Sequence, residues 1–179
     1  MDAPEPHAST ALSLAARTLR AIGAVFLRIP RGRAIVPVLL WAGLIFFMSS
    51  RPAPSLPGVG QFAGVLANFA HALEYGVFAV FLALLAPRAQ GWVELRPRTA
   101  LLILAGVLLY AASDEWHQSF TPHRDASVFD VLTDFTGASA TLACIAALGR
   151  RDAGRAFGIA FALGLLASLA AAALATYGA

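Results

Sequence analysis

The sequence predicts an all-α, polytopic membrane helix bundle with about five transmembrane helices and an N-terminal helix at the membrane interface. Three observations lead to this fold class: 59% hydrophobic and only 13% charged residues, a mean hydropathy of +0.71, and a series of long apolar runs. Soluble domains carry about 25% charged residues, so this chain has too few charges to cover a surface in water. A bilayer removes that requirement.

Five apolar stretches approach or reach the roughly 20 residues that a spanning helix needs. Prolines stand at the ends of these stretches or between them, as expected where a helix must stop. The expected spans are residues 35–50, 66–86, 99–116, 128–148 and 157–177.

The N-terminal part of the chain differs from these spans because arginines are interspersed among its apolar residues. Residues 13–27 have the pattern of a helix that lies in the membrane interface, and the alternative is a partly disordered cytoplasmic tail. We therefore divide the chain into an arginine-rich N-terminal segment, a four-helix transmembrane domain and a fifth transmembrane helix, at residues 1–33, 34–148 and 149–179.

The distribution of arginine indicates the orientation in the membrane. All 13 basic residues are arginine. Five precede the first span, and the next four connections hold one, three, one and three. By the positive-inside rule, the N-terminus is cytoplasmic and the C-terminus extracytoplasmic, as expected for a multi-pass protein of a bacterial cytoplasmic (inner) membrane. Because the arginines lie in these connections, nucleic acid is not an expected partner. The sequence does not indicate which protein partner, if any, the chain has.

Ionisable side chains interrupt three of the expected spans, although a charge at the bilayer centre costs about 2.5–3.5 kcal/mol. Residues three or four apart share one face of a helix, and this spacing recurs in all three spans. The expected orientation puts these faces in the outer half of the membrane. We predict one site there, with His71 or Glu74 within reach of Asp130 or of the turn at 114–118. The candidate residues are His71, Glu74, Tyr75, Ser113, Asp114, Glu115, His117, Gln118, Arg124, Asp130 and Asp134.

Several chemistries fit this set of residues. Histidines and carboxylates could ligate a divalent metal, and the candidate ligands are His71, Glu74, Asp114 and His117. The same groups could relay protons, and Arg124 could bind a phosphate or carboxylate through its bidentate fork. The remaining alternative is an internal salt-bridge network that pins two helices together.

Two short stretches carry a more specific pattern. Residues 113–124 read S-D-E-W-H-Q-S-F-T-P-H-R, and residues 130–137 read D-V-L-T-D-F-T-G. Upstream, His71 and Tyr75 form an H-x-x-x-Y element. Together these residues resemble the VanZ-like family of membrane proteins, whose patterns are S-D-E-x-x-Q-x-F-x-P-x-R and D-V-x-x-N-x-x-G. The resemblance covers residues 35–148.

The sequence departs from the family pattern at two positions. Asp134 stands where asparagine is usual and adds a potential negative charge. Asn68 lies in the region where a lysine often precedes the histidine. If that lysine holds an anion in other members, this chain holds its ligand differently.

The resemblance implies a bacterial cell-envelope protein, in a family whose founding member is associated with low-level resistance to the glycopeptide teicoplanin. We expect a membrane protein that binds an envelope lipid, its head group or a lipid-linked envelope precursor at an outward-facing polar pocket, with or without a divalent metal. One alternative is a membrane-embedded hydrolase or transferase, with a carboxylate or His117 as general base. Another is a structural partner in a membrane assembly. The sequence assigns no catalytic residue.

Overall fold

The computed structural model describes residues 6–52, 60–122, 124 and 126–178. Its elements are the helices α1 (Pro6–Phe26), η1 (a 3-10 turn, Arg31–Ala34), α2 (Ile35–Ser49) and α3 (Gly60–Ala83), the strands β1 (Arg88–Ala89) and β2 (Trp92–Val93), and the helices α4 (Pro97–Gln118), α5 (Val128–Leu148) and α6 (Ala153–Tyr177).

Within the described residues, five helices are long and apolar enough to cross a membrane, and this confirms the predicted all-α membrane bundle. Many of their large apolar side chains are exposed, Leu40 and Leu109 among them, as lipid-facing surfaces require. α3 begins at Gly60 rather than at residue 66, because a helix continues past its apolar run into the more polar membrane edge. The candidate spans are Arg31–Ser49, Phe62–Ala83, Pro97–Gln118, Val128–Leu148 and Ala153–Tyr177.

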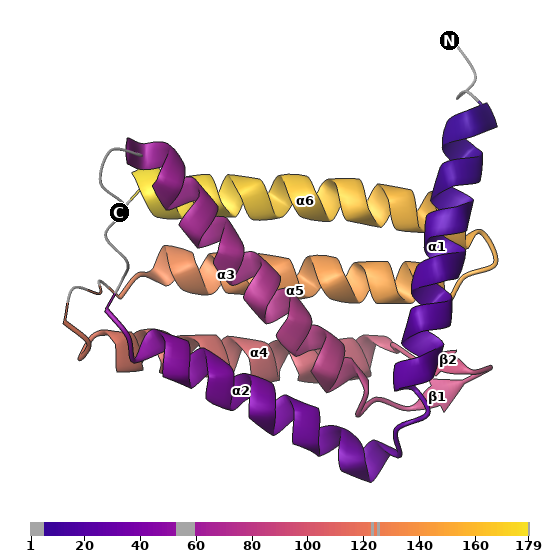
Figure 1. Ribbon diagram of the computed structural model, residues 1–179, viewed down its shortest axis with the longest axis horizontal. Helices are drawn as coiled ribbons and strands as arrows, with labels where there is room; N and C mark the ends of the chain where they lie inside the picture. The colour runs from indigo at the N-terminus through magenta and orange to yellow at the C-terminus, as the bar shows by residue number, and fades with distance from the viewer. Residues whose placement is uncertain (1–5, 53–59, 123, 125, 179) are drawn as a thin grey trace.

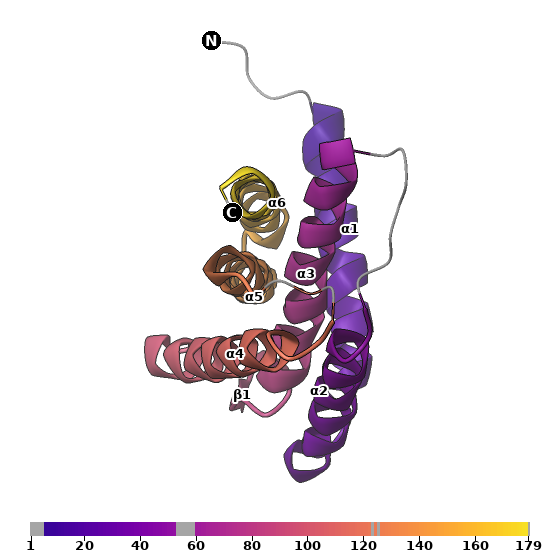
Figure 2. The same ribbon diagram turned by 90° about the vertical axis from the view of Figure 1, so that its left-hand side faces the viewer.

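α5 is the central helix of the bundle. It packs most extensively against α6 and α3 and also contacts α4. α5 and α6 run side by side along the long axis (Figure 1) and are seen end-on in Figure 2, where α3 lies along one side of both. α2 contacts α3 and α4. The main apolar core lies where α2, α3, α4 and α5 meet and includes Ile45, Phe78, Val107 and Leu142.

α1 crosses the ends of α5 and α6 instead of running along them (Figure 1). On its inner face Ala16 is buried at 2% exposure, and Leu12 packs so closely on α6 that a Cβ on Gly158 would meet it at 2.9 Å. On its outer face Leu14 is exposed. This amphipathic helix corresponds to the interfacial helix expected at residues 13–27, although α1 begins earlier in the chain.

A short β-hairpin between α3 and α4 was not predicted from the sequence. Ala89 pairs with Trp92 across a two-residue turn in which Gln90 and Gly91 have φ angles of 51° and 73°, the positive values that a type I′ turn needs. Trp92 is buried, and its indole Nε1–H donates to the carbonyl of Ile145 at 2.9 Å. Two-residue strands are too short to give a periodic pattern, so the sequence indicated only a loop.

α3 and α5 touch backbone to backbone at Gly137 of α5. A Cβ at this position would collide with the carbonyl of Ala72 in α3 and lie 2.6 Å from its Cα. Next to this contact, a Cβ on Gly76 would meet the Thr141 hydroxyl at 2.8 Å. Small residues at crossings allow the close van der Waals packing that holds helices together in lipid. Gly137 therefore fixes the point at which α3 crosses α5.

We expect the change Gly137→Ala to destabilise the protein strongly, because the α3 backbone cannot move aside as a flexible side chain could. Overpacking a core commonly costs about 1–3 kcal/mol of unfolding free energy, and a clash with backbone should fall at the upper end of that range. Thermal melting of the purified protein in a neutral detergent measures the effect.

The matched control is Gly106→Ala in α4, where no atom lies within 4 Å of the added Cβ. Alanine also favours a helix more than glycine does, so this variant should melt at or above the wild-type temperature. If the two variants melt alike, the α3–α5 contact does not limit the size of the residue at position 137.

Candidate functional site

The structure gathers the predicted polar residues where α3, the end of α4 and the start of α5 meet. His71 lies within electrostatic range of Asp114, Asp130 and Arg124. Glu74 lies within range of Asp114 and Arg124. Both Glu74 and Asp130 are half-buried. The polar faces of three helices thus share one region of the bundle.

Asp134 is the acid of α5 that His71 approaches directly. Its Oδ1 lies 3.7 Å from His71 Nδ1, close enough for an ion pair when the imidazole is protonated but too long for a hydrogen bond. Asp134 is 1% exposed, and Tyr75, one turn along α3 from His71, is 0% exposed. The sequence predicted that His71 or Glu74 would come within reach of Asp130 or of the turn at 114–118. Asp130 and Asp114 are within electrostatic range of His71, and Asp134 is the acid at ion-pair distance.

Asp114 is buried and joins α4 to the end of α2. The Ser49 hydroxyl donates to Asp114 Oδ2 at 2.8 Å, and the Gln118 amide donates to the same oxygen at 2.9 Å. The other oxygen, Oδ1, accepts no hydrogen bond from the described residues. One oxygen of this carboxylate is therefore structural, and the other is available.

Glu115 joins the end of α4 to the start of α5. Its Oε2 accepts a hydrogen bond from the backbone N–H of Ser127 at 2.8 Å. The Ser127 hydroxyl accepts in turn from the backbone N–H of Phe129 and so caps α5. Glu115 Oε1 is buried with no partner in the described part of the chain, so this carboxylate also has one oxygen available.

Arg124 binds the end of α2. Its guanidinium donates to the carbonyls of Arg51 at 3.1 Å and Met48 at 3.2 Å, and to Gln118 Oε1 at 3.4 Å. The Met48 carbonyl also accepts from the backbone N–H of Arg51 at 3.1 Å, so Arg124 adds a charged side-chain donor to carbonyls at the end of α2. Among the described residues no ion pair joins Arg124 to an acid. Its visible role is to hold α2 to the connection before α5.

His117 and Ser113 line a cavity of about 410 Å³ beside the buried cluster. The His117 ring stacks on Phe46 with ring centroids 4.4 Å apart, and its Nε2 lies 3.0 Å from the Ser50 hydroxyl. Asp114 also lines this cavity, which therefore connects an aromatic surface with a buried carboxylate. The lining residues are Phe46, Tyr110, Ser113, Asp114, Trp116, His117 and Phe120.

Several buried polar atoms of the site have no hydrogen-bond partner among the described residues. An atom of this kind costs about 1–3 kcal/mol, and native proteins normally satisfy it with water or a ligand. Three of these atoms are carboxylate oxygens, which makes the site rich in acceptors. The atoms are His71 Nδ1, Tyr75 Oη, Asp114 Oδ1, Glu115 Oε1 and Asp134 Oδ1.

The geometry gives no support to the suggested metal ligands His71, Glu74, Asp114 and His117. Within the described residues, no group of three or more His, Cys, Asp or Glu side chains is arranged to hold a metal ion. His71 faces Asp134, whereas His117 stacks on Phe46. His123, which is part of the sequence motif, lies outside the described residues.

Sequence reasoning missed the residues of the first span that complete the site. Ser49 donates to Asp114, and the Ser49 carbonyl accepts from the Thr121 hydroxyl at 3.4 Å. The Tyr110 hydroxyl donates to the carbonyl of Ala42 at 2.6 Å. The only signal in the sequence was the Ser49–Ser50 pair at the end of an apolar run, and it identified no partner.

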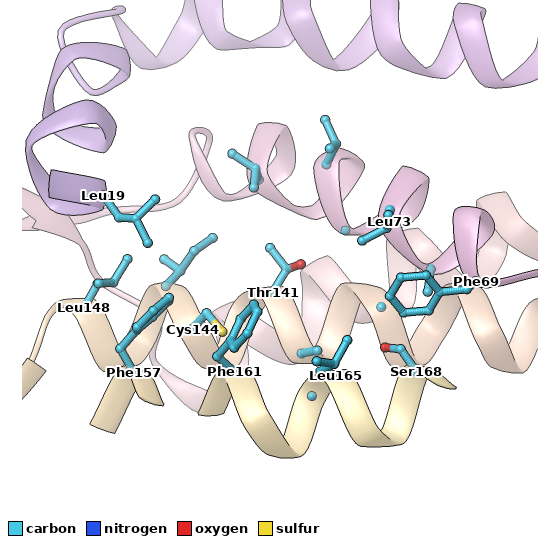
Figure 3. Close-up of a pocket in the computed structure, with 18 residues that line it drawn as sticks. Leu19, Phe69, Leu73, Thr141, Cys144, Leu148, Phe157, Phe161, Leu165 and Ser168 are labelled. Atoms are coloured by element: carbon cyan, nitrogen blue, oxygen red, sulfur yellow. The ribbon is translucent and has the colours of Figure 1, made fainter. Parts of the chain in front are cut away.

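A second cavity, of about 420 Å³, lies between α3, α5 and α6 (Figure 3). Phe69, Phe157 and Phe161 line it, with hydroxyls from Thr141 and Ser168. Among the described residues that line it, Cys144 is the only titratable one. This cavity is an apolar slot between helices and carries none of the polar atoms described above.

The family comparison matches the region that contains this site. The model of the VanZ/LLP1 family matches residues 34–149, which include α2 to α5 and every predicted site residue. Neither the curated proteins nor the solved structures contain a match to this chain. Because the matched region is more than half of the 179 residues, the chain belongs to the VanZ/LLP1 family.

Proposed function

We propose that this membrane protein binds the head group of an envelope lipid, or of a lipid-linked envelope precursor, at the polar site. The observation that carries the proposal is the group of buried polar atoms without partners on α3, α4 and α5. Polar groups inside a membrane protein normally mark a pathway or a ligand site because they are costly. A ligand with complementary groups removes that cost.

The charges of the site favour a head group that donates hydrogen bonds. Three of the unpartnered atoms are oxygens of Asp114, Glu115 and Asp134. Sugar or glycerol hydroxyls and primary amines supply the donors that these oxygens need. A guanidinium has five N–H donors, and Arg124 makes three hydrogen bonds within the protein. Its remaining donors would hold the phosphate that links a head group to its lipid.

The cavity beside Asp114 is the entrance that suits an amphiphile. Its walls include the exposed side chains of Trp116 and Phe120, each 70% exposed, which would contact an acyl or prenyl chain. Aromatic residues of this kind favour the membrane–water interface. A lipid could thus place its chain against aromatic side chains and its head group toward Asp114 and His117.

A membrane-embedded hydrolase or transferase is the second candidate, and the His71–Asp134 pair favours it. A carboxylate beside an imidazole orients the ring and stabilises its protonated form, as in general-base catalysis. His71 Nδ1 and Asp134 Oδ1 are 3.7 Å apart, and the pair lies in the same cluster as the unpartnered Glu115 Oε1. In this reading the bound head group is also a substrate.

The proposal places the site on the outer side of a bacterial cytoplasmic membrane. Apart from Arg51 and Arg124, the arginines lie at the end of the bundle that carries α1, the hairpin and the α5–α6 connection (Figure 1). The positive-inside rule makes that end cytoplasmic. An outward-facing lipid site would also give the family's link with teicoplanin a physical route, because that glycopeptide is lipophilic.

Cysteine labelling tests this orientation in a Cys144→Ala background. We expect a cysteine at Ala126, which is exposed before α5, to react with a membrane-impermeant maleimide added to intact cells. A cysteine at Ala89, exposed in the hairpin, should react only after the membrane is opened. Labelling in the opposite order would reverse the proposed orientation.

Lipid retention tests the proposed ligand. Asp114→Asn keeps an oxygen for Ser49 and Gln118 and replaces the unpartnered Oδ1 with an NH₂ donor. We expect native mass spectrometry to show that wild type retains phosphatidylethanolamine over phosphatidylcholine, whose head group has no N–H or O–H. In the variant, the ratio of retained phosphatidylethanolamine to phosphatidylcholine should fall about tenfold, because one hydrogen bond to a charged group is removed.

Glu94→Gln is the matched control, since it removes a carboxylate that pairs with the exposed Arg96 at the other end of the bundle, and it should leave the preference unchanged. If wild type shows no preference, the proposed head-group binding is wrong. If wild type converts the lipid to a product of different mass, and His71→Asn does not, the enzyme reading replaces simple binding.

Arg124 gives a separate prediction. Arg124→Ala should lower the unfolding free energy by about 1.5–3 kcal/mol, because hydrogen bonds from a charged donor to the Met48 and Arg51 carbonyls are lost. Arg124→Lys should restore only part of this, since an ammonium cannot span the same acceptors. Thermal melting in detergent provides the measurement, with the exposed Arg98→Ala as control.

The double variant Arg124→Ala/Asp114→Asn distinguishes the roles of Arg124. If Arg124 holds α2, removing the charge of Asp114 does not restore stability. Full restoration would show instead that Arg124 acts by neutralising that acid.

A further inference from the structure

A strongly basic cavity lies at the opposite end of the bundle from the polar site. It has a volume of about 410 Å³ and lies between α1 and the connection from α5 to α6. Figure 1 shows α1 passing beside this connection. We call its charged residues the arginine rim, which comprises Arg17, Arg20, Arg150, Arg151, Asp152 and Arg155.

The positive charge of the arginine rim is only partly balanced. Arg150 pairs with Asp152 at 3.0 Å, and this hydrogen bond holds the pKa of the Asp152 carboxyl below its ordinary value. Arg17, Arg151 and Arg155 form no ion pair with any described residue. Like charges held together repel one another, so the rim is suited to an added anion.

Arg20 has a different role from these three arginines. Its guanidinium donates to the carbonyl of Leu148 at 3.1 Å and lies over the Trp92 ring, 5.6 Å from its centroid. Arg20 thus fastens α1 to the end of α5. The rim is therefore held at a fixed place by contacts that do not use Arg17, Arg151 or Arg155.

An apolar groove continues from the same connection along α5 and α6. This cavity, of about 700 Å³, is lined by alanines and one isoleucine together with three residues of the rim, Arg150, Asp152 and Arg155. The groove residues are Ala143, Ala146, Ala147, Ala156, Ile159 and Ala160. The arginine rim and this alanine groove are thus adjacent, at the ends of α5 and α6 where the two helices are connected.

We infer that the arginine rim and the alanine groove together bind an anionic phospholipid of the leaflet at this end of the bundle. Its phosphate lies among Arg151, Arg155 and Arg17, whose planar forks match phosphate oxygens. One acyl chain lies in the groove. Basic pockets at the ends of transmembrane helices are suited to anionic head groups. A soluble phosphate would use the rim but not the groove, and the adjacency of the two therefore favours a lipid.

The inference is independent of the proposed function. It concerns different residues at the opposite end of the bundle, and the polar site is rich in acceptors whereas the rim is rich in donors. Either site could fail its test without affecting the other.

Lipid retention by the full chain in neutral detergent tests the rim. Native mass spectrometry should show that wild type retains phosphatidylglycerol at least about tenfold over phosphatidylcholine, because each arginine near a membrane surface favours anionic lipid. Arg151→Gln/Arg155→Gln should lose that preference. The matched control Arg96→Gln/Arg98→Gln, which removes two arginines from another connection at the same end, should keep it. If the two double variants behave alike, the assignment is overturned.

A second pair of variants tests the groove. Ala146→Phe fills the groove from an exposed position and should reduce phosphatidylglycerol retention, whereas Ala112→Phe, at an exposed position of α4, should not. Glycerol 3-phosphate, which lacks acyl chains, should not displace the lipid at equal concentration. If Ala146→Phe has no effect, or glycerol 3-phosphate displaces the lipid, the site binds soluble phosphate and the lipid assignment is wrong.

Discussion

The contact between Gly137 and Ala72 is the constraint on which the rest of the bundle depends. Lipid offers no hydrophobic force to press helices together, so close packing of small residues must do it. With no side chain at Gly137, the α3 backbone lies directly on α5. That crossing sets the register of α3, and the register brings His71 and Tyr75 to the level of Asp134. A bulkier residue would move these groups apart.

α2 contributes Ile45 to the apolar core, and polar contacts at defined points add to its attachment. The Trp41 indole donates to the carbonyl of Glu74 at 3.0 Å, Ser49 donates to Asp114, and Arg124 holds the end of the helix. Hydrogen bonds of this kind have fixed geometry, so they specify the position of a helix whose apolar surface could pack in several ways. α2 therefore closes one side of the polar site through both its buried apolar side chains and these hydrogen bonds.

The sequence was sufficient for the features that depend on composition. Long apolar runs predicted five spans, and ionisable residues within them predicted where polar chemistry would gather. It could not distinguish Asp130 from Asp134 as the partner of His71, because both lie on one face of α5 and only the crossing at Gly137 selects between them. Nor could it predict that Arg124 donates hydrogen bonds to the Met48 and Arg51 carbonyls. Every residue has a backbone carbonyl, so the sequence does not indicate which of them a side chain will reach.

The His71–Asp134 pair also has a consequence for biosynthesis. About 60 residues separate the two, so at a translation rate of about 5–20 residues per second His71 is made roughly 3–12 seconds before its partner. During that interval α3 contains a histidine and the carboxyl group of Glu74 without the acid that His71 will face. Until α5 emerges, these groups lack the partners that the folded bundle gives them. The site is therefore completed late, and a nascent chain that stops before α5 holds an unfinished membrane domain.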